Sequence, residues 1–337
     1  MQLKPLSPAS LAAILCITLP AEGLSQGTPA TSELVVHTQI KKLALMVSLD
    51  QLDGFQQRRQ EWRSDPAGYN NIRLQLHHGD LKLDWQGDTP SRIDGTLSSL
   101  KISRDLYSGP SCRGSQQGGI SAGSSFVNGD SSALLSERGA NLPVGQNQLQ
   151  SHFIGAYFSD YRNTGHYFDL QAKLAYLRTD SRAHSGRSAT RHGVQIALSA
   201  ESGLDIALGE HYNLEPQAQL LANYTSLNAF SANGYRMDTG VTPELNLRLG
   251  LRAYATGKPH FAFANFWYTL DGDDELYGSG QLELKSPRGA RWLELGLGTR
   301  LLQLPFADLS LDIRYRSAAD DYDWSDISAN LGLSWAW

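Results

Sequence analysis

Residues Ile327 to Trp337 read ISANLGLSWAW, and this closing stretch decides the fold. Every second residue from Ile327 is apolar, and the residues between them are small or polar. A β-strand points alternate side chains to opposite faces, so the segment has one apolar face and one small, wet face. The last residues of a soluble domain usually fray into water, which makes two closing tryptophans unusual there. In a closed barrel the apolar face would meet lipid, the small face would line the lumen, and the tryptophans would lie at the membrane interface.

The spacing of four residues in this stretch also matches a known pattern. Asn330, Gly332, Trp335 and Trp337 follow the order polar, any, Gly, any, any, apolar, any, aromatic. This order resembles the C-terminal signal by which bacterial outer-membrane barrels are recognised for insertion. The resemblance implies that these residues form a barrel-assembly signal, with periplasmic chaperones and the barrel-assembly machinery as partners.

The composition fits a barrel better than a helical membrane protein. The 337 residues could form one large domain or two ordinary ones. The mean hydropathy is −0.34, and no run of about 18–20 apolar residues follows the N-terminus, so no spanning helix is expected. Alternating barrel strands leave almost no hydropathy signal, and 32 glycines suit a lumen that needs small side chains. The net charge of −5 weighs weakly against a nucleic-acid partner.

The first residues read as a secretory signal peptide. Lys4 supplies a positive end, residues 11–19 (LAAILCITL) form an apolar core, and a small-residue site follows. We expect cleavage after Ser25, with cleavage after Ala21 as the alternative. Of the two cysteines, one lies in the apolar core and would be removed, so Cys112 would have no partner for an internal disulfide.

The alternation of the closing stretch recurs along the chain and predicts twelve strands in all. Its polar face mixes Gly, Ser, Asn and Gln with Arg, Asp and Glu, which suits a confined wet lumen where charges pair. A large soluble β-sandwich or lectin-like domain is the alternative. The segments are longer than the usual strand of about 5–6 residues, which favours the barrel. The eleven further segments are 71–85, 96–108, 118–127, 148–159, 165–177, 192–208, 212–224, 244–252, 260–270, 291–303 and 308–316.

The connections between these segments support the barrel independently. Counted back from the C-terminus they alternate between long and short, which is typical of outer loops and periplasmic turns. The long ones are 318–325, 271–290, 226–242, 178–191 and 128–147, and the short ones are 304–306, 256–259, 209–211 and 160–164. The connection 109–117 is an exception, because it is longer than its place predicts. Residues 281–285 form a thirteenth strand-like segment that we interpret as part of a long loop.

A helix is predicted over residues 33–53, ahead of the first strand. Its apolar residues recur at intervals of four, three and four, and Gly54 then breaks the run before the basic residues Arg58, Arg59 and Arg63. One interpretation is an amphipathic helix at the bilayer surface or a poorly ordered leader. The other is a plug in the lumen, where the two lysines would meet acidic residues on the polar, lumen-facing side of the strands. These residues are Glu201, Glu215, Glu244, Glu294, Asp308 and Asp312. The helix residues concerned are Val36, Ile40, Lys41, Lys42, Leu43 and Val47.

From about Gly68 to Trp337 the chain resembles the β-domain of the classical (type V) autotransporters of Gram-negative bacteria. The clearest match is the segment Leu214, Glu215, Pro216, Gln217, Ala218, Gln219 and Leu220, followed by the segment from Asn246 to Arg252 with Arg248 and Gly250. Further similar segments are 165–169, 201–203, 295–298 and 331–335. The resemblance implies a twelve-stranded barrel with a helix through its pore that carries an N-terminal passenger to the cell surface.

The sequence departs from this family pattern ahead of the helix. Between the expected signal peptide and the helix only residues 26–33 remain, so no passenger domain fits there. Three interpretations stay open: the chain displays almost nothing, it works as the barrel itself, or its reading frame is the remnant of a longer one. A passive pore or a surface-loop adhesion protein is the alternative function.

Few residue patterns point to other chemistry. His77, His78 and Asp80 could be metal ligands or a proteolytic pair, but the spacing supplies no third group, and a polar break in a strand is preferred. Asn70 and Asn71 could mark self-cleavage, although they lie outside the predicted helix. Acidic residues 271–275 could hold a divalent cation, and the arginines of loop 178–191 could meet lipopolysaccharide phosphates. A solvated acidic loop is the preferred interpretation of the former, and no enzymatic motif or cofactor site is apparent.

The sequence therefore predicts an all-β, twelve-stranded antiparallel outer-membrane barrel with an N-terminal helix in its lumen. The expected domains are a signal peptide (1–25), a leader with the linker or plug helix (26–67) and the barrel (68–337). We expect a monomeric outer-membrane translocator without catalytic activity, metal or other cofactor. Its expected partners are outer-membrane lipid and lipopolysaccharide, and export is expected to depend on the signal peptide.

Overall fold

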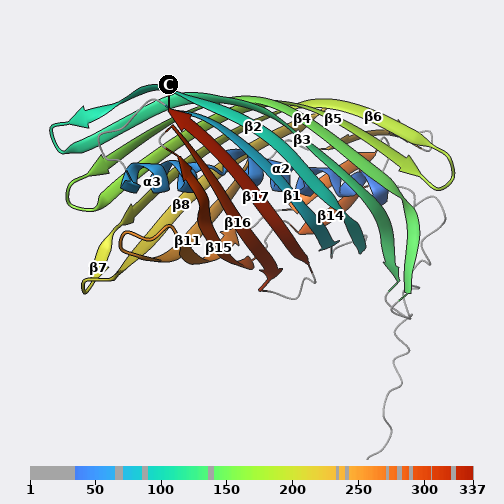
Figure 1. Cartoon of the computed structure of the whole chain (residues 1–337). Helices are drawn as coiled ribbons and strands as arrows, with labels where there is room; N and C mark the ends of the chain where they lie inside the picture. Colours follow the sequence, from blue (N-terminus) through green and yellow to red (C-terminus); the bar gives the residue numbers. More distant parts are fainter. Residues whose placement is uncertain are drawn as a thin grey trace, which may run out of the picture.

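Twelve antiparallel strands of the computed structural model form a closed barrel around two helices (Figure 1). The structure describes residues 35–64, 71–85, 90–135, 140–232, 235–239, 243–270, 273–278, 283–287, 291–304, 306–319 and 324–336. The barrel strands are β1 (Asn71–Trp85), β2 (Ser91–Ser111), β3 (Gly114–Leu135), β4 (Ala140–Arg162), β5 (His166–Ala183), β6 (Ser188–Leu204), β8 (Tyr212–Leu227), β11 (Glu244–Ala255), β12 (Phe261–Thr269), β15 (Arg291–Leu304), β16 (Ala307–Ala318) and β17 (Ser325–Ala336). The predicted fold class is confirmed.

The barrel closes because its first and last strands pair with each other. β17 lies antiparallel to β1 from the pair Asn71 and Ala336 to the pair Lys82 and Ser325. Every other barrel strand pairs with its neighbours in chain order, and the three-residue β7 (Ile206–Leu208) extends the β6–β8 connection. The closing stretch of the sequence therefore forms the seam of the barrel.

Side chains alternate between lumen and exterior as the sequence predicts. Along β5, exposed and buried residues alternate almost without interruption. On β17, Ile327, Leu331 and Leu333 are exposed, whereas Ser328 and Asn330 between them are buried. An exposed apolar face over most of the sheet would be costly in water, but it matches a hydrocarbon environment.

Tight turns connect neighbouring strands at one end of the barrel, and we call this end the short-turn end. β2 and β3 meet across Cys112 and Arg113, so the connection 109–117 is as short as its place requires. The predicted connection was too long because the pairing register of β2 with β3 shifts between Asp105 and Tyr107. This shift interrupts the alternation of apolar and polar residues from which the end of the strand was predicted.

The opposite, long-loop end is built mostly from strands rather than loops. β3, β4, β5 and β6 continue through most of the predicted loops 128–147 and 178–191. In these extensions the polarity of the two faces is reversed: Ala133 and Val144 face inward, whereas Asp130 and Gln146 face outward. A search for lipid-facing apolar residues misses strands that continue beyond the bilayer.

Two connections at the long-loop end form a separate four-stranded sheet. It contains β9 (Phe230–Ala232), β10 (Tyr235–Thr239), β13 (Asp273–Gly278) and β14 (Glu283–Pro287), in the order β14-β13-β10-β9. The strand-like segment 281–285 thus overlaps β14, outside the barrel sheet, as interpreted from the sequence. The sheet ties the β8–β11 connection to the β12–β15 connection.

The N-terminal helix is confirmed and lies in the lumen, but a second helix follows it. Residues 35–38 are helical and lead into α2 (Ile40–Leu52). Gly54 adopts a φ of 125° between the helices, and a side chain there would collide with Gln75 and Lys101. α3 (Phe55–Ser64) escaped prediction because its sequence FQQRRQEWRS has no apolar stripe. No described helix is long and apolar enough to cross a membrane.

Replacing Leu249 by arginine tests the outward face. Leu249 is 54% exposed on the apolar side of β11, so the variant should lose about 2–4 kcal/mol of unfolding free energy if this position lies near the bilayer midplane. Urea titration of the barrel in lipid vesicles, followed by tryptophan fluorescence, measures the change. Leu249→Phe is the control and should cost less than about 1.5 kcal/mol. Equal stability of the arginine variant and the unmodified chain would contradict the assignment of this face to lipid.

Candidate functional site: the helix-filled lumen

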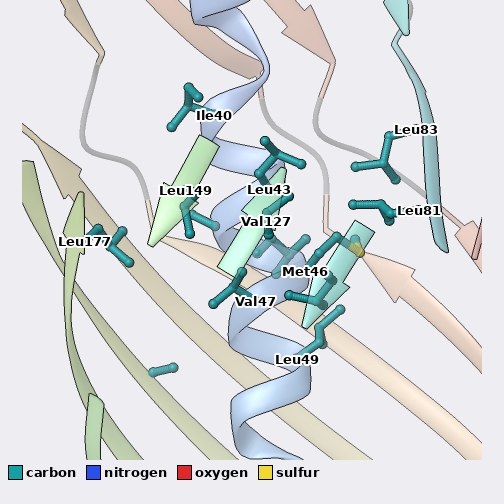
Figure 2. Close-up of a cluster of buried hydrophobic side chains, with 14 of the residues drawn as sticks. Ile40, Leu43, Met46, Val47, Leu49, Leu81, Leu83, Val127, Leu149 and Leu177 are labelled. Atoms are coloured by element: carbon teal, nitrogen blue, oxygen red, sulfur yellow. The ribbon is translucent and has the colours of Figure 1, made fainter. Parts of the chain in front are cut away.

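The outer half of the lumen holds α2 in an apolar collar. Ile40, Leu43 and Val47 of the helix are fully buried there (Figure 2). Each buried aliphatic side chain contributes about 1.5–3 kcal/mol by leaving water. The collar comprises the wall residues Leu81, Leu83, Ile93, Leu97, Val127, Leu149, Phe153, Ala175, Leu177, Ala197, Leu221, Leu227, Trp267, Trp292 and Trp324.

Towards the short-turn end, the contacts of α2 become polar. Gln51 donates from Nε2 to the hydroxyls of Ser125 (3.0 Å) and Ser151 (2.9 Å). The Lys173 ammonium donates to Ser48 (2.9 Å) and to Gln51 Oε1 (2.8 Å). Because these wall residues are short or reach inward, the helix can lie close to the sheet and its polar groups find fixed partners.

α3 is held in the lumen by arginines that are buried against carboxylates. Arg58 pairs with Asp169 at 2.8 Å and Arg59 with Glu215 at 3.0 Å, and none of the four side chains is more than 2% exposed. The Arg58 guanidinium lies 4.2 Å from the centre of the Tyr157 ring. Charge-assisted, aromatic-backed pairs of this kind fix a helix in one orientation as well as binding it.

The wall continues the charged network around a small cavity beside the helices. Arg248 pairs with Glu201 at 2.7 Å, and Tyr167 donates to the same carboxylate at 2.8 Å. Across the lumen, Arg314 lies 2.6 Å from Asp53, next to the break between α2 and α3. This cavity measures about 50 Å³, which is room for water rather than for a large solute.

The outer end of the lumen helix is fixed separately. Asn147 donates to the backbone carbonyl of Val36 at 2.8 Å. The ring of His37 lies 4.5 Å from that of Phe230 in the loop sheet, and the Arg191 guanidinium lies 4.7 Å from the same ring. Burial, with Arg191 nearby, lowers the pKa of His37 from 6.5 to about 4. His37 is therefore neutral around pH 7 and packs as an aromatic residue.

The segment that carries the autotransporter resemblance forms part of this lumen wall. Glu215, Gln217 and Gln219 of β8 face inward, while Pro216 between them faces outward. Arg248 on the neighbouring β11 also faces inward, opposite Gln219, and Leu214 and Gly250 are partly buried. Among the inward residues of the motif, Glu215 meets α3, Gln219 and Arg248 line the cavity, and Gln217 donates to Glu215 at 2.8 Å.

The residues of the expected assembly signal lie at the seam. Asn330 faces the lumen, where its side chain contacts His77 at 2.7 Å and Asp312 at 3.0 Å. Gly332 is buried with Gln57 of α3 beside it. Trp335 is partly buried and pairs with Ile72, whereas Trp337 and the expected cleavage site at Ser25 lie outside the described residues.

The predicted helix residues separate into two groups. Val36, Ile40, Leu43 and Val47 are completely buried in the apolar part of the lumen. Lys41 and Lys42 are partly buried. The carboxylates proposed as partners of these lysines include Glu201, Glu215 and Glu294, and these pair with the arginines 248, 59 and 314. The proposed lysine partnership stays a prediction.

The other candidate clusters divide or lie outside the description. His77 faces the lumen, and His78 and Asp80 face outward, so the three do not converge. No group of three or more His, Cys, Asp or Glu residues with metal-binding geometry occurs within the described ranges. The side chains of the acidic loop 271–275 are not described, and Asn70 of the possible cleavage pair also lies outside.

The arginine cluster proposed for loop 178–191 needs a correction. Arg178, Arg182 and Arg187 are exposed, but Arg191 is 1% exposed, faces the lumen and donates to the carbonyl of Asn228. The reason is strand parity, because this segment is strand rather than loop and residue 191 falls on the inward side.

Comparison with known proteins identifies the architecture. The family model described as the autotransporter beta-domain matches residues 88–336. The chain belongs to this family. Autotransporter β-domains are translocator barrels rather than enzymes, and they sit in the outer membrane of Gram-negative bacteria. The match begins after β1, so the placement of β1 and of the helices rests on the structure of this autotransporter β-domain itself.

Solved autotransporter barrels share the fold at low sequence identity. The transport unit of AIDA-I from Escherichia coli is 13% identical, with a TM-score of 0.64 over 79% of this chain and 90% of that one. The Bordetella BrkA β-domain is 18% identical, with a TM-score of 0.58 over 80% and 100%. The NalP translocator domain from Neisseria meningitidis is 16% identical, with a TM-score of 0.58 over 86% and 98%. No curated protein sequence matches the chain.

Changing Glu215 to leucine should loosen α3. The variant removes the carboxylate 3.0 Å from buried Arg59 and leaves that arginine with Asp205 at 3.7 Å. Breaking a buried ion pair costs up to about 3–5 kcal/mol. Urea unfolding measures the loss of free energy, and limited proteolysis of the folded barrel reports whether α3 has left the lumen. The double variant Arg59→Leu, Glu215→Leu is the matched control and should be less destabilised. If the double variant lost as much as the single one, the pair would not anchor the helix.

Acid should weaken the outer anchor through His37. Its pKa is about 4 in the folded chain against 6.5 when exposed. The stabilisation is therefore complete above about pH 6.5 and is lost as pH falls towards 4, because the unfolded chain binds the proton first. Protease accessibility of the segment around Val36, measured between pH 7.5 and 4.5, should rise on acidification. His37→Phe should remove that dependence, and an unchanged pH profile in this variant would assign the effect to other groups.

Proposed function

We propose that the chain is the translocator unit of an autotransporter, which anchors the segment ahead of Val35 at the cell surface. The observation that carries this proposal is the direction of the lumen helix. Its Val36 end packs on Ala133 and Val144 at the long-loop end. Its other end leads through α3, whose Phe55 packs on Tyr161 and Tyr167, towards the start of β1.

The two helices together carry the chain along the lumen. Val36 packs on Ala133 and Val144 in the strand extensions beyond the bilayer, and α3 follows α2 towards the short-turn end. β1 begins at the short-turn end, whereas Val35, at the start of the described residues, lies at the opposite, long-loop end. Long connections mark the outer face in bacterial barrels. A polypeptide attached ahead of the helix would therefore be displayed outside the cell, whatever its length.

A packed lumen favours this role over a passive pore. The collar, the Gln51 and Lys173 contacts and the arginine pairs fill the barrel from the outer anchor to the short-turn end. An open channel would instead need a continuous water-filled path. We assign the chain no catalytic step and no cofactor.

A reporter fusion tests the proposed function. A small epitope-tagged domain inserted between residues 26 and 34 should be cut by protease added to intact cells, while the barrel stays whole. The same tag placed in the tight turn at Cys112–Arg113 is the control and should be cut only after the outer membrane is permeabilised. A tag ahead of the helix that remained protected beside a correctly folded barrel would contradict the proposal.

Export and insertion would depend on the two ends of the sequence. We propose that the signal peptide ending at Ser25 directs export, and that periplasmic chaperones and the barrel-assembly machinery then act on the closing strand. Support for the second step comes from the seam, since β17 must pair with both β16 and β1 before the barrel can close. Outer-membrane lipid surrounds the product, which we propose to be a monomer.

Changing Trp335 to aspartate should block insertion. The substitution places a charge on the lipid-facing side of the seam and breaks the proposed assembly signal, so exported but unfolded, protease-sensitive protein should accumulate. Fractionation and heat-modifiable gel migration measure the folded fraction, and N-terminal analysis of the accumulated form locates the signal cleavage. Trp335→Phe is the control and should fold. Normal outer-membrane amounts of the aspartate variant would reject the role of the motif.

A further inference from the structure

A broad hollow interrupts the lipid-facing surface of β2 to β6. It measures about 770 Å³ and is almost entirely apolar at its lining, which places it within the range of about 300–1,000 Å³ typical of ligand sites. Its floor is formed at Ala122, Ala156 and Ala172, and large exposed aliphatic residues surround them. The surrounding side chains are Ile102, Ile120, Ile154, Leu174, Ile196 and Leu198.

The outer edge of this hollow carries polar and basic side chains in register. The aliphatic row Ile154, Leu174 and Ile196 pairs across three strands. Two residues further towards the long-loop end, His152 of β4 pairs with Tyr176 of β5. Two residues beyond that, Arg178 of β5 pairs with His192 of β6. All four side chains are exposed, so the apolar band changes to a basic, hydrogen-bonding edge at the upper boundary of the hollow.

The two histidines are oriented by neighbouring strands rather than left to rotate. Nδ1 of His152 lies 2.7 Å from the Ser124 hydroxyl. Nδ1 of His192 lies 2.6 Å from the Tyr176 hydroxyl, and the two rings stack with centroids 5.9 Å apart. Because Nδ1 is engaged within the sheet in each case, the exposed part of each ring presents the other nitrogen, Nε2, outward.

The basic charge is only partly balanced within the patch. Arg178 donates from Nε to Asp180 at 3.1 Å, and its side chain remains 49% exposed. Arg182, four residues further out on the same face of β5, is also exposed. A guanidinium has five N–H donors in a fork that matches phosphate oxygens, so one carboxylate contact does not exhaust it.

We propose that the hollow and its basic edge bind one phosphorylated, multiply acylated lipid of the outer leaflet. The acyl chains occupy the hollow, and the phosphate meets Arg178 with His152 and His192. Charge complementarity selects this occupant, because apolar chains and an anionic group must be joined in one molecule to match the two adjacent surfaces. The inference rests on the proposed outer-membrane location, which puts the long-loop end of the strands in the outer leaflet.

The opposite end of the hollow provides an internal control. Arg104 lines it near the start of β1, where it pairs with Ile72 and thus lies towards the short-turn end. A lipid held from the inner leaflet would depend on Arg104, whereas the proposed lipid depends on Arg178. The two arginines therefore report which leaflet supplies the headgroup.

The test uses the full mature chain folded into phosphatidylcholine nanodiscs. Diphosphorylated lipid A and the same lipid A without its phosphates are titrated, and bound lipid is counted by native mass spectrometry. Arg178→Gln should weaken binding of the phosphorylated lipid about tenfold, the size expected for a charge-assisted contact, and should bring it towards that of the dephosphorylated form. Arg104→Gln should leave the affinity unchanged. Ala156→Phe, which fills the floor, should weaken both lipids.

Several outcomes would overturn the assignment. Equal affinity of the unmodified chain for both lipids would contradict the proposed phosphate site. Loss of binding in Arg104→Gln but not in Arg178→Gln would move the headgroup to the other leaflet, and a dimer in place of bound lipid would make the hollow an interface between copies. Each variant is first required to show heat-modifiable migration. A barrel that folds but does not bind lipid contradicts this proposal alone, whereas a chain that does not fold in the membrane contradicts the proposed function.

Discussion

Backbone hydrogen bonding in a solvent without water is the constraint on which the rest of this structure depends. Unpaired N–H and C=O groups cost several kcal/mol each in hydrocarbon, so a sheet in a bilayer must close on itself. The pairing of β1 with β17 removes the last two edges. Closure then fixes an enclosed lumen, and an enclosed lumen must be filled by side chains, water or another segment of the chain. In this protein α2 and α3 fill most of it.

Two kinds of interaction hold the helices, and they are separated along the lumen. In the outer part, apolar side chains of α2 meet an apolar collar that includes Leu149 and Trp292. In the part near the short turns, Arg58 and Arg59 meet Asp169 and Glu215. The apolar contacts are tolerant of small rotations, whereas the ion pairs are directional. The collar therefore supplies much of the attraction, and the arginine pairs fix the depth and rotation of the plug.

The sequence predicted the barrel because its strongest signal has a period of two over long segments. All twelve barrel strands and the helix ending near Leu52 follow from that pattern and from the apolar spacing of Val36, Ile40, Leu43 and Val47. The pattern failed where the strands leave the lipid. There the outside is polar and the inside apolar, as at Asp130 and Ala133, so extended strands resembled loops.

The lumen contacts were harder to foresee, because they join residues far apart in sequence. Nothing local in FQQRRQEWRS indicates which carboxylates Arg58 and Arg59 will meet, and those partners lie more than a hundred positions away. The inward positions of the β8 motif gave a partial signal, since Glu215 had already been placed on the polar face. If residues 188–191 had been predicted as strand, the alternation of side chains would also have placed Arg191 on the inward face.

The seam between β1 and β17 also imposes an order of events in time. The two strands lie at opposite ends of the barrel sequence, so their contact closes the longest loop in the chain and comes late on entropic grounds. The helices precede β1 and lie inside the finished ring. Threading them through a sealed ring would require the collar to release its packing, whereas an open sheet can curl around a helix already resting on its inner face. Pairing of β17 with β1 thus completes the enclosure of α2 and α3, which come first in the sequence.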